Sequence, residues 1–513
     1  MNRTNENDRG SDFLQLRRPS TPAAGLTTWL VDAVRAAIAD GRLRTGAHLP
    51  ATRVLAADLK VSRGVVVEAY RRLAEEGLVS GRAGAGTRVT TVMTAAGGTA
   101  VATATGPASG TTGPERPRAA DAPAESPPAM PRLPLGPFAP PVDIDLSPGL
   151  PDLSGFPRSA WLRAERFVLG GASADAFAYG DPRGALTLRQ ELAGWLGRVR
   201  GVRADPRDIL VVGGVAQSLA LVAQTLRRRG VTEIAVEDPG SRGAQDALSY
   251  WGLRPVPVPV DEQGLRVDEL VRTGVSAALL TPAHQFPTGV VLAPGRRREL
   301  LSWAHDGGLV VEDDYDAEHR YDRAPVPALQ ASAPEHVVHT GSVSKTLAPG
   351  MRLGWLIAPQ GMREELIAAK HASDLGTPVL PQLVLARLIA GGDLDRHLRL
   401  TRGRYRSRRD AFLTTLTARL PSVRVQGIAA GLHLLITFPE LTGTVPDTEL
   451  ADRVRAAGVL THPLSWHRVA PGPPGLVLGY AAHPADRLRD AAHRIAATVR
   501  AARSGGAGPV QGP

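Results

Sequence analysis

The chain has 513 residues, 43% of them hydrophobic, so it is globular and too long for one ordinary core; two or three domains are expected. No run approaches the roughly eighteen apolar residues of a membrane span, and the polar N-terminal segment lacks the apolar core of a secretory signal. The absence of cysteine excludes disulfides and thiolate metal sites and is typical of a cytoplasmic protein, while the net charge of +10 indicates an anionic partner, with nucleic acid as the first candidate.

Residues 14–90 are predicted to form a small basic domain that begins with two helices. An apolar residue recurs at every fourth position from Leu26 to Ile38 and a glycine follows, which predicts an amphipathic helix and its end. Pro50 then opens a second, shorter helix over 51–60. Twelve basic and six acidic side chains give this domain a net charge of +6, over half that of the chain.

A third predicted helix and a pair of strands complete this domain. Ser62 is a good N-cap for a helix that ends at Gly77. Residues 78–80 and 87–90, separated by a glycine-rich turn, are predicted to form a two-stranded wing. This is the layout of a winged helix-turn-helix, in which the third helix enters the major groove of DNA with its N-terminal end first.

The segments Leu49–Ala56, Val61–Arg63 and Ala69–Val79 closely resemble the GntR family of regulators. The resemblance implies a DNA-binding set, with its last two members on the wing: Arg53, Ser62, Arg63, Arg82 and Thr87. The alternative for each arginine is an ordinary solvated charge. Gly64 stands where the family often has threonine, so a hydroxyl donor is lost and the base preference is left open.

Two segments without apolar periodicity divide the rest of the chain. Ala, Thr, Gly and Pro dominate residues 91–141, which cannot bury enough apolar surface to offset their conformational entropy and are predicted to form a flexible linker. Residues 504–513 are glycine-rich and predict a disordered tail. Residues 142–503 are expected to form one large domain, whose smaller subdomain covers about 395–503.

Short apolar runs alternate with helical stretches in the large domain, which predicts an α/β fold with a mostly parallel sheet covered by helices. The runs lie at 209–212, 234–236, 277–280, 309–311 and 337–338. Functional residues of such sheets gather at the carboxyl ends of the strands.

Residues suited to one cofactor follow these runs. The free backbone N–H groups of Gly214, Val215 and Ala216 open a helix after the first run and suit a phosphate. After the fourth run, Asp313 can keep a pyridinium nitrogen protonated and Tyr315 can hydrogen-bond a ring hydroxyl. Taken singly, the aspartate could be a surface acid and the tyrosine a core aromatic residue.

Lys345 is one of only three lysines among 60 basic residues. Unlike arginine, lysine can lose its proton and condense with a carbonyl. Ser342 and Ser344 precede it and Arg352 follows, which gives a cradle for an aldehyde that bears a phosphate, such as pyridoxal 5'-phosphate (PLP). Lys370, in contrast, is expected to be an ordinary surface residue.

The span from Ile144 to about Arg500 resembles the fold type I aminotransferases. Four phrases in it resemble the MocR subfamily, in which a GntR-type reader precedes an aminotransferase-like domain; they cover residues 179–184, 284–289, 312–321 and 342–352. The resemblance implies PLP as the cofactor, with Lys345 forming the internal aldimine. It also implies a homodimer, because Tyr179 would reach the phosphate of the cofactor in the partner subunit.

The resemblance assigns the remaining cofactor contacts. Asp313 would pair with the pyridine nitrogen, and Tyr315 would hydrogen-bond the ring oxygen. The phosphate would be held by Gly214, Val215, Ala216, Ser342, Ser344 and Arg352.

The sequence departs from the aminotransferases at three positions near the cofactor or the substrate. Ser241 stands where many relatives have an aromatic ring over the cofactor, and Phe286 stands where aminotransferases usually place asparagine beside the ring oxygen. Val477 lies where an arginine commonly binds the substrate carboxylate, and Arg468 is an open alternative for that task. These losses weaken catalysis more than they weaken capture of the cofactor.

An arginine run over 396–409 has two interpretations, a second DNA surface or a solvated helix of the smaller subdomain, and the helix is expected. Two functions remain open. The favoured one is a DNA-binding transcription regulator that senses PLP, or an amine or amino acid, through an aldimine. The alternative is an active PLP-dependent aminotransferase with a vestigial or autoregulatory DNA-binding head. A regulator without PLP is a third outcome, and no metal site is expected.

Overall fold

A computed structural model of the chain describes two compact units, one on each side of Ser126, and each is treated by itself. The residues described are 26–39, 43, 46–75, 78–82, 86–89, 142–322 and 326–505. The whole predicted linker, residues 91–141, and residues 506–513 of the predicted tail therefore lie outside them. Within these ranges no helix has the length and apolar character needed to cross a membrane.

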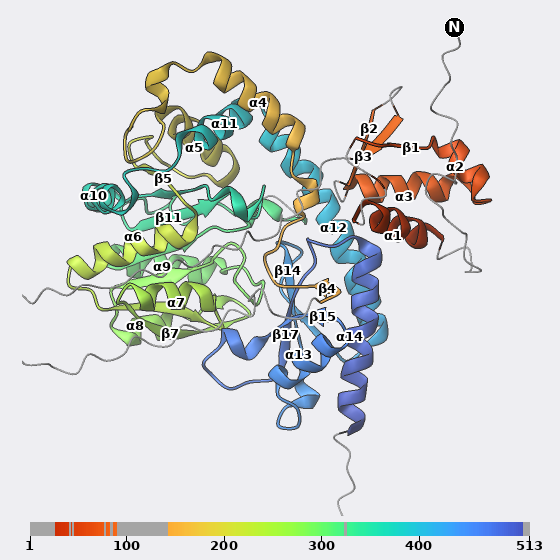
Figure 1. Cartoon of the computed structure of the whole chain (residues 1–513). Helices are drawn as coiled ribbons and strands as arrows, with labels where there is room; N and C mark the ends of the chain where they lie inside the picture. Colours follow the sequence, from red (N-terminus) through yellow and green to blue (C-terminus); the bar gives the residue numbers. More distant parts are fainter. Residues whose placement is uncertain are drawn as a thin grey trace, which may run out of the picture. The chain divides into compact units, whose positions relative to one another are not determined.

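The first unit is a three-helix domain with a small sheet (Figure 1). Its elements are α1 (Leu26–Ala39), β1 (His48–Leu49), α2 (Thr52–Asp58), α3 (Arg63–Glu75), β2 (Val79–Arg82) and β3 (Gly86–Val89). The three predicted helices and the two-stranded wing are confirmed, and β1 adds a third strand in the order β1-β3-β2. The Tyr70 hydroxyl on α3 donates a buried 2.9 Å hydrogen bond to the Pro50 carbonyl, which fixes α3 against the start of α2.

The second unit is built on an eight-stranded sheet in the order β5-β12-β11-β10-β9-β6-β7-β8. Its strands are β5 (Ile209–Val212), β6 (Glu233–Asp238), β7 (Arg254–Asp261), β8 (Gly264–Leu265), β9 (Ala277–Leu280), β10 (Leu309–Asp313), β11 (Val337–Ser342) and β12 (Gly354–Ile357). All five predicted runs are strands. The central strands are parallel, while β12 is antiparallel to both β5 and β11.

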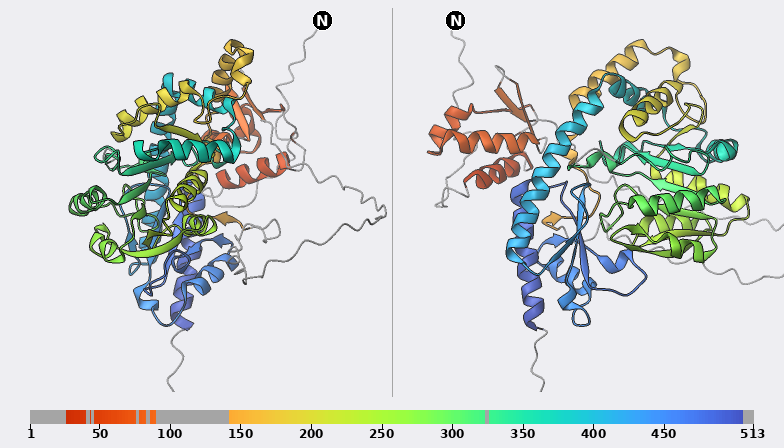
Figure 2. Two further views of the ribbon diagram at one scale, coloured as in Figure 1. Left: turned by 90° about the vertical axis from the view of Figure 1, so that its left-hand side faces the viewer. Right: turned by 180° about the vertical axis from the view of Figure 1, so that it is seen from behind.

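Helices cover both faces of this sheet (Figure 2). Because successive strand residues point to opposite faces, Leu210 and Val212 pack in one core, which includes residues of α6, α7 and α10, while Ile209 and Val211 pack in another with residues of α5 and α11. The covering helices are α4 (Arg158–Gly171), α5 (Leu186–Arg200), α6 (Val215–Arg228), α7 (Arg242–Tyr250), α8 (Val267–Thr273), α9 (Pro294–His305), α10 (Arg363–Asp374) and α11 (Val379–Ala390).

A smaller subdomain follows, with a four-stranded sheet in the order β13-β14-β17-β16. It comprises β13 (Arg424–Gln426), β14 (His433–Thr437), α13 (Asp447–Ala456), β15 (Val459–Leu460), β16 (His462–Pro463), β17 (Gly475–Gly479) and α14 (Ala485–Gly505). The short strand β4 (Ile144–Asp145) pairs with β15, so the start of the unit joins this subdomain.

The long helix α12 (Asp393–Arg419) connects the two subdomains (Figure 2). Leu394 and Leu398 near its start belong to a core of the large sheet, whereas Phe412 and Leu416 belong to the core of the small one. The expectation of a solvated helix holds only in part, because Arg408 is buried and pairs with Asp152 at 3.0 Å.

The expectation that Lys370 lies on the surface is wrong. Its side chain on α10 is fully buried, and its Nζ atom lies 2.5 and 2.6 Å from the carboxylate oxygens of Asp374. Asp374 also accepts a 2.8 Å hydrogen bond from Gln217 on α6. An ammonium can be buried here because a carboxylate one helical turn away pairs with it.

Candidate functional site

Strand register brings the predicted phosphate ligands together at one end of the large sheet. β12 lies between β5 and β11, and Gly354 is opposite Val212 on one side and Ser342 on the other. A Cβ atom on Gly354 would lie 3.0 Å from the Cα of Gly214 and 3.1 Å from the Cβ of Ser342. Only glycine therefore allows the glycine turn after β5 and the serine at the end of β11 to approach this closely.

The N-terminus of α6 points its free donors at this place. Gly214 precedes the helix with φ +97°, and within the described ranges the N–H groups of Gly214, Val215 and Ala216 have no hydrogen-bond partner. Arg352 adopts a left-handed backbone (φ +46°), and its guanidinium lies 3.4 Å from where a Cβ of Gly214 would stand. Helix N–H groups and a guanidinium together are suited to an anion such as a phosphate.

The two predicted serines lie beside this cradle. Ser342 is buried at the end of β11, and its Oγ atom accepts a 3.3 Å hydrogen bond from the backbone N–H of Ser344, which is half-buried. Each hydroxyl proton remains available to a phosphate oxygen.

Lys345 lies one residue beyond Ser344 and is half-buried. Burial lowers the pKa of its amine, although the carboxylates of Asp316 and Asp313 oppose this effect. Its Nζ atom donates a 2.7 Å hydrogen bond to the carbonyl of Gly149. A lowered pKa favours the neutral amine, which is the form that attacks a carbonyl.

Asp313 ends β10, and its buried Oδ1 atom has no hydrogen-bond partner among the residues that the structure describes. Burial, reinforced by the neighbouring Asp314, raises the pKa of Asp313 to about 7. A buried carboxylate oxygen without a donor is costly, and the N–H of a pyridinium ring would satisfy it. The amine, the carboxylate and the anion cradle therefore fit PLP.

Asp314 has a structural role beneath the site. Its carboxylate lies 2.6 Å from Arg200 and 3.1 Å from His339, and all three side chains are buried. Burial alone would raise the pKa of Asp314, but the Arg200 guanidinium and His339 hold it well below its usual range. Asp314 is therefore a fixed anion, and its charge helps to keep Asp313 protonated when no cation faces it.

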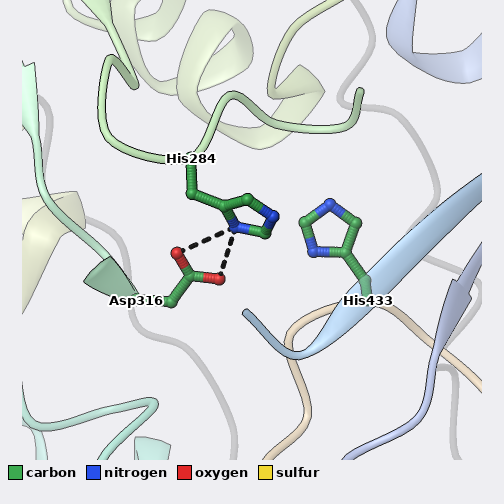
Figure 3. Close-up of side chains that lie close together, drawn as sticks. All are labelled: His284, Asp316 and His433. Carbon is green, nitrogen blue, oxygen red and sulfur yellow. Dashed lines mark hydrogen bonds and ion pairs between the residues drawn. The ribbon is translucent and has the colours of Figure 1, made fainter. Parts of the chain in front are cut away.

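Tyr315 belongs to a buried polar cluster that the sequence did not predict. Its hydroxyl oxygen lies 3.1 Å from the Nδ1 atom of His284. Asp316 places its two carboxylate oxygens 3.0 and 3.1 Å from that same nitrogen, and His433, at the start of β14, faces the pair (Figure 3). His284, Asp316 and His433 each contribute one ring nitrogen or carboxylate oxygen, and these three atoms lie within 4.8 Å of one another.

A glycine lets the small subdomain reach this cluster. Gly431 has φ +72°, and a Cβ on it would lie 2.2 Å from the Cε1 atom of His284 and 2.5 Å from an Asp316 oxygen. His284, Asp316 and His433 come from three separate segments of the sequence, so no single local motif predicts that they meet. The only signals in the sequence were a histidine, an acid and a glycine near predicted strand ends.

The departures from the aminotransferases are packed together. Phe286 packs against an apolar cluster formed by Leu435, Leu464 and Val477. The Arg468 guanidinium donates to the carbonyls of Pro473 (2.9 Å) and Gly472 (2.5 Å) in its own loop, so two of its five N–H donors are already engaged.

A small cavity marks the third departure. Ser241 caps α7 by accepting a hydrogen bond from the Ala244 N–H, and with Glu237 and Asp313 it lines a cavity of about 20 Å³. Because the serine side chain is short, it leaves space where many relatives have an aromatic ring over the cofactor. Tyr179, which was predicted to serve the partner subunit, is 91% exposed after η5 (Ala174–Phe177).

The predicted DNA-binding residues of the first unit lie on α2, at the start of α3 and on the two-stranded wing. Arg53 and Arg63 are exposed, and Ser62 is confirmed as the N-cap because the Val65 N–H donates to its Oγ atom at 3.4 Å. Thr87 is half-buried on β3, and the side chain of Arg82 lies outside the described residues.

Two further arginines of α3 are engaged within the helix. Arg71 and Arg72 both hydrogen-bond Glu68, at 2.5 and 3.0 Å. The hydrogen bond from Arg71, followed by that from Arg72, lowers the pKa of Glu68 to about 2, although partial burial opposes the shift. These two arginines are therefore poorer candidates for DNA contact than Arg53 and Arg63.

Comparison with known proteins covers both units. Residues 143–495 match aminotransferase class I and II, and residues 26–89 match the gntR family of bacterial regulatory proteins. The chain is 32% identical to the HTH-type pyridoxine biosynthesis transcriptional regulator PdxR of Corynebacterium glutamicum, over 92% of this chain and 95% of that protein. It is 30% identical to the probable rhizopine catabolism regulatory protein MocR of Rhizobium meliloti, over 94% of this chain and 95% of that protein.

Solved structures resemble the second unit. A kynurenine aminotransferase of Pyrococcus horikoshii has a TM-score of 0.63 and 28% identity over 70% of this chain and 91% of its own. A multiple substrate aminotransferase of Thermococcus profundus has a TM-score of 0.65 and 27% identity, over 70% of this chain and 92% of its own. The winged helix is followed along the sequence by an aminotransferase domain, and the relatives share this domain order. The chain therefore belongs to the MocR subfamily of GntR transcription regulators.

Proposed function

We propose that this regulator holds PLP on Lys345 and binds double-stranded DNA through the start of α3, and that PLP itself, or an amine or amino acid that reacts with it, is the effector. The observation that carries the proposal is the Oδ1 atom of Asp313, which has no hydrogen-bond partner among the described residues, together with the half-buried Lys345, whose pKa is lowered by burial. Two relatives, one named as a regulator of pyridoxine biosynthesis and one as a probable regulator of rhizopine catabolism, support effectors of this kind.

PLP supplies an aldehyde for a lysine amine and an electron-accepting ring. The protein supplies the rest. Asp313 would hold a proton on the ring nitrogen, Tyr315 would donate its hydroxyl proton to the ring oxygen, and the Arg352 guanidinium with the α6 N–H groups would neutralise the phosphate. The carbonyl of Gly149 would orient the lysine amine.

An amine effector would compete with Lys345 for the cofactor aldehyde and release the lysine side chain. Such a ligand changes DNA affinity only if it binds two arrangements of the protein with different free energies. We propose a homodimer, in which Tyr179 reaches the phosphate in the partner subunit; its 91% exposure leaves its hydroxyl free for such a contact.

The test is binding to intergenic DNA next to the gene, measured by footprinting and electrophoretic shift at several salt concentrations, with and without PLP and candidate amines. We expect a protected site whose affinity changes with PLP or with one amine. A protein that binds no such DNA at any salt concentration and in either cofactor state would exclude the proposal.

The alternative of a working aminotransferase is less well supported. Phe286 and Val477 put an apolar cluster in place of a polar cofactor contact and a substrate arginine, and Arg468 donates to carbonyls of its own loop. We therefore expect at most a half-reaction with an amino donor. Sustained turnover of an amino donor and a 2-oxo acid would favour the alternative.

A further inference from the structure

The pair formed by His284 and Asp316 has no task in the function proposed above. His284 lies in the loop after β9, and Asp316 lies three residues beyond β10, at the start of η6 (Ala317–His319). Both side chains are buried, at 3% and 1% exposure. Their contact leads directly to Tyr315, because the tyrosine hydroxyl and the carboxylate approach the same nitrogen of His284.

The carboxylate determines which protons this nitrogen and the tyrosine carry. An ionised carboxylate only accepts hydrogen bonds, so two oxygens at 3.0 and 3.1 Å require Nδ1 of His284 to carry a proton. A protonated Nδ1 cannot accept the hydroxyl proton of Tyr315, although it can donate to the hydroxyl oxygen at 3.1 Å. The tyrosine proton must then point away from His284.

Among the described residues, the Tyr315 hydroxyl is within hydrogen-bond distance of the His284 nitrogen alone, so no other described residue accepts its proton. We propose that His284, fixed by Asp316, is a positioning residue that aims the Tyr315 hydroxyl proton at the ring oxygen of bound PLP. The inference rests on the proposed cofactor. Tyr315 would then be the donor to the ring oxygen, beside an apolar side chain at Phe286 that cannot donate to it.

Surrounding groups keep the pair in place. Gly431 leaves no room for a side chain between the small subdomain and the pair, and Tyr321 donates a hydrogen bond to the Gly431 carbonyl. His433 lies against the His284 ring with a centroid distance of 5.1 Å. His284 therefore cannot rotate away from Asp316 without moving β14 or its preceding loop.

The test is the pH titration of the visible absorption band of the PLP-loaded full-length protein. A donor to the ring oxygen stabilises negative charge there and weakens that oxygen's hold on the nearby proton, so its loss raises the titration midpoint. Asp313, Asp316 and His433 also face Lys345 and influence this midpoint, and the chosen variants leave them in place.

Two substitutions of His284 separate a positioning role from a packing role. His284→Asn keeps a donor near the place of Nδ1, whereas His284→Gln moves the amide toward the place of Nε2. We expect the Asn variant to titrate like the natural protein and the Gln variant to titrate about one unit higher, close to Tyr315→Phe. His483→Gln, whose Nε2 atom lies 2.8 Å from the Asp145 carbonyl, is the matched control and should titrate normally.

The double variant His284→Gln/Tyr315→Phe should titrate like Tyr315→Phe alone, because the histidine acts through the tyrosine. A normal midpoint in the Gln variant, or a shift that adds to that of Tyr315→Phe, overturns the inference. If the Gln variant does not fold, an Asn variant that titrates like Tyr315→Phe does the same. A natural protein with no visible band would instead refute the proposed cofactor, and this inference with it.

Discussion

The Nζ atom of Lys345 and the carbonyl oxygen of Gly149 lie 2.7 Å apart, although the two residues are 196 positions apart in the sequence. Gly149 has φ +82°, and a Cβ on it would lie only 2.6 Å from Nζ. The lysine amine is therefore held by a position where only glycine fits. This contact fixes the reactive atom on which the proposed function depends.

Replacing this glycine should impair cofactor binding. Gly149→Ala adds a clashing methyl group and strains a left-handed backbone. We expect PLP to bind at least about tenfold more weakly, because displacement of the amine by even 1 Å disturbs the reacting geometry. Absorbance titration with PLP measures this change.

The control for this variant is Gly403→Ala on α12, where an added Cβ meets no atom within 4 Å. Alanine is a better helix former than glycine by about 1 kcal/mol, so the control should fold normally and bind PLP normally. Equal PLP affinity in the Gly149→Ala protein would show that the contact is dispensable.

The raised pKa of Asp313 predicts a pH-dependent stability of the cofactor-free protein. Since burial raises this pKa from 3.8 to about 7, the folded protein binds the proton more tightly than the unfolded one. Its contribution is present below about pH 4 and is lost as the pH rises through 7. The free energy of unfolding of the natural protein should therefore fall, relative to Asp313→Asn, by on the order of 1–3 kcal/mol over this range.

Comparison with the Asn variant isolates this one carboxyl. Glu237 and Glu318, whose pKa values burial also raises to about 7, contribute equally to both proteins and cancel. Urea unfolding at several pH values provides the free energies. Parallel pH profiles for the two proteins would show that folding does not raise the pKa of Asp313.

DNA binding should depend on Arg63 and Arg53 more than on other arginines of the first unit. Both are exposed near the start of α3 or α2. Replacement of either by alanine should weaken DNA binding by about tenfold. Loss of a phosphate contact should also reduce the slope of log K against log salt concentration by about one. Arg71→Ala is the control, because Glu68 holds that guanidinium at 2.5 Å. If all three variants bind equally well, α3 does not present this surface to DNA.

The apolar cluster around Phe286 should resist restoration of a substrate arginine. Val477 is fully buried on β17, so Val477→Arg should lower the free energy of unfolding by at least about 3 kcal/mol, because the charge has no partner there. Val469→Arg, at a site that is 70% exposed, should change it by less than about 0.5 kcal/mol. A stable Val477→Arg protein that gains affinity for an amino acid would show that a polar substrate site persists.

The sequence predicted the elements that have a local signal. Apolar residues at every fourth position located α1, and short apolar runs located five strands of the large sheet. The predicted cofactor residues Asp313, Tyr315 and Lys345 do lie close together. Three strands of the large sheet, β7, β8 and β12, were missed. β8 is only two residues long, and β12 is four residues long and begins with glycine. β7 carries a proline at every second position, which is tolerated near a sheet edge but argues against a strand in a sequence.

Contacts that depend on the fold could not be predicted. Lys370 looked like a surface lysine because its sequence gives no sign that α10 turns it inward. Gly149 and the pair of His284 and Asp316 acquire their meaning only from residues more than thirty positions away. A backbone carbonyl or a shared nitrogen leaves no pattern in the sequence, so such contacts require the three-dimensional arrangement.

The most direct test of the central claim is mass spectrometry of the PLP-loaded full-length protein after borohydride reduction and proteolysis. With only three lysines in the chain, the peptides that carry Lys60, Lys345 and Lys370 are easily distinguished. We expect a pyridoxyl adduct on Lys345 and none on the other two. An adduct on Lys60 or Lys370 instead, or on no lysine, would contradict it.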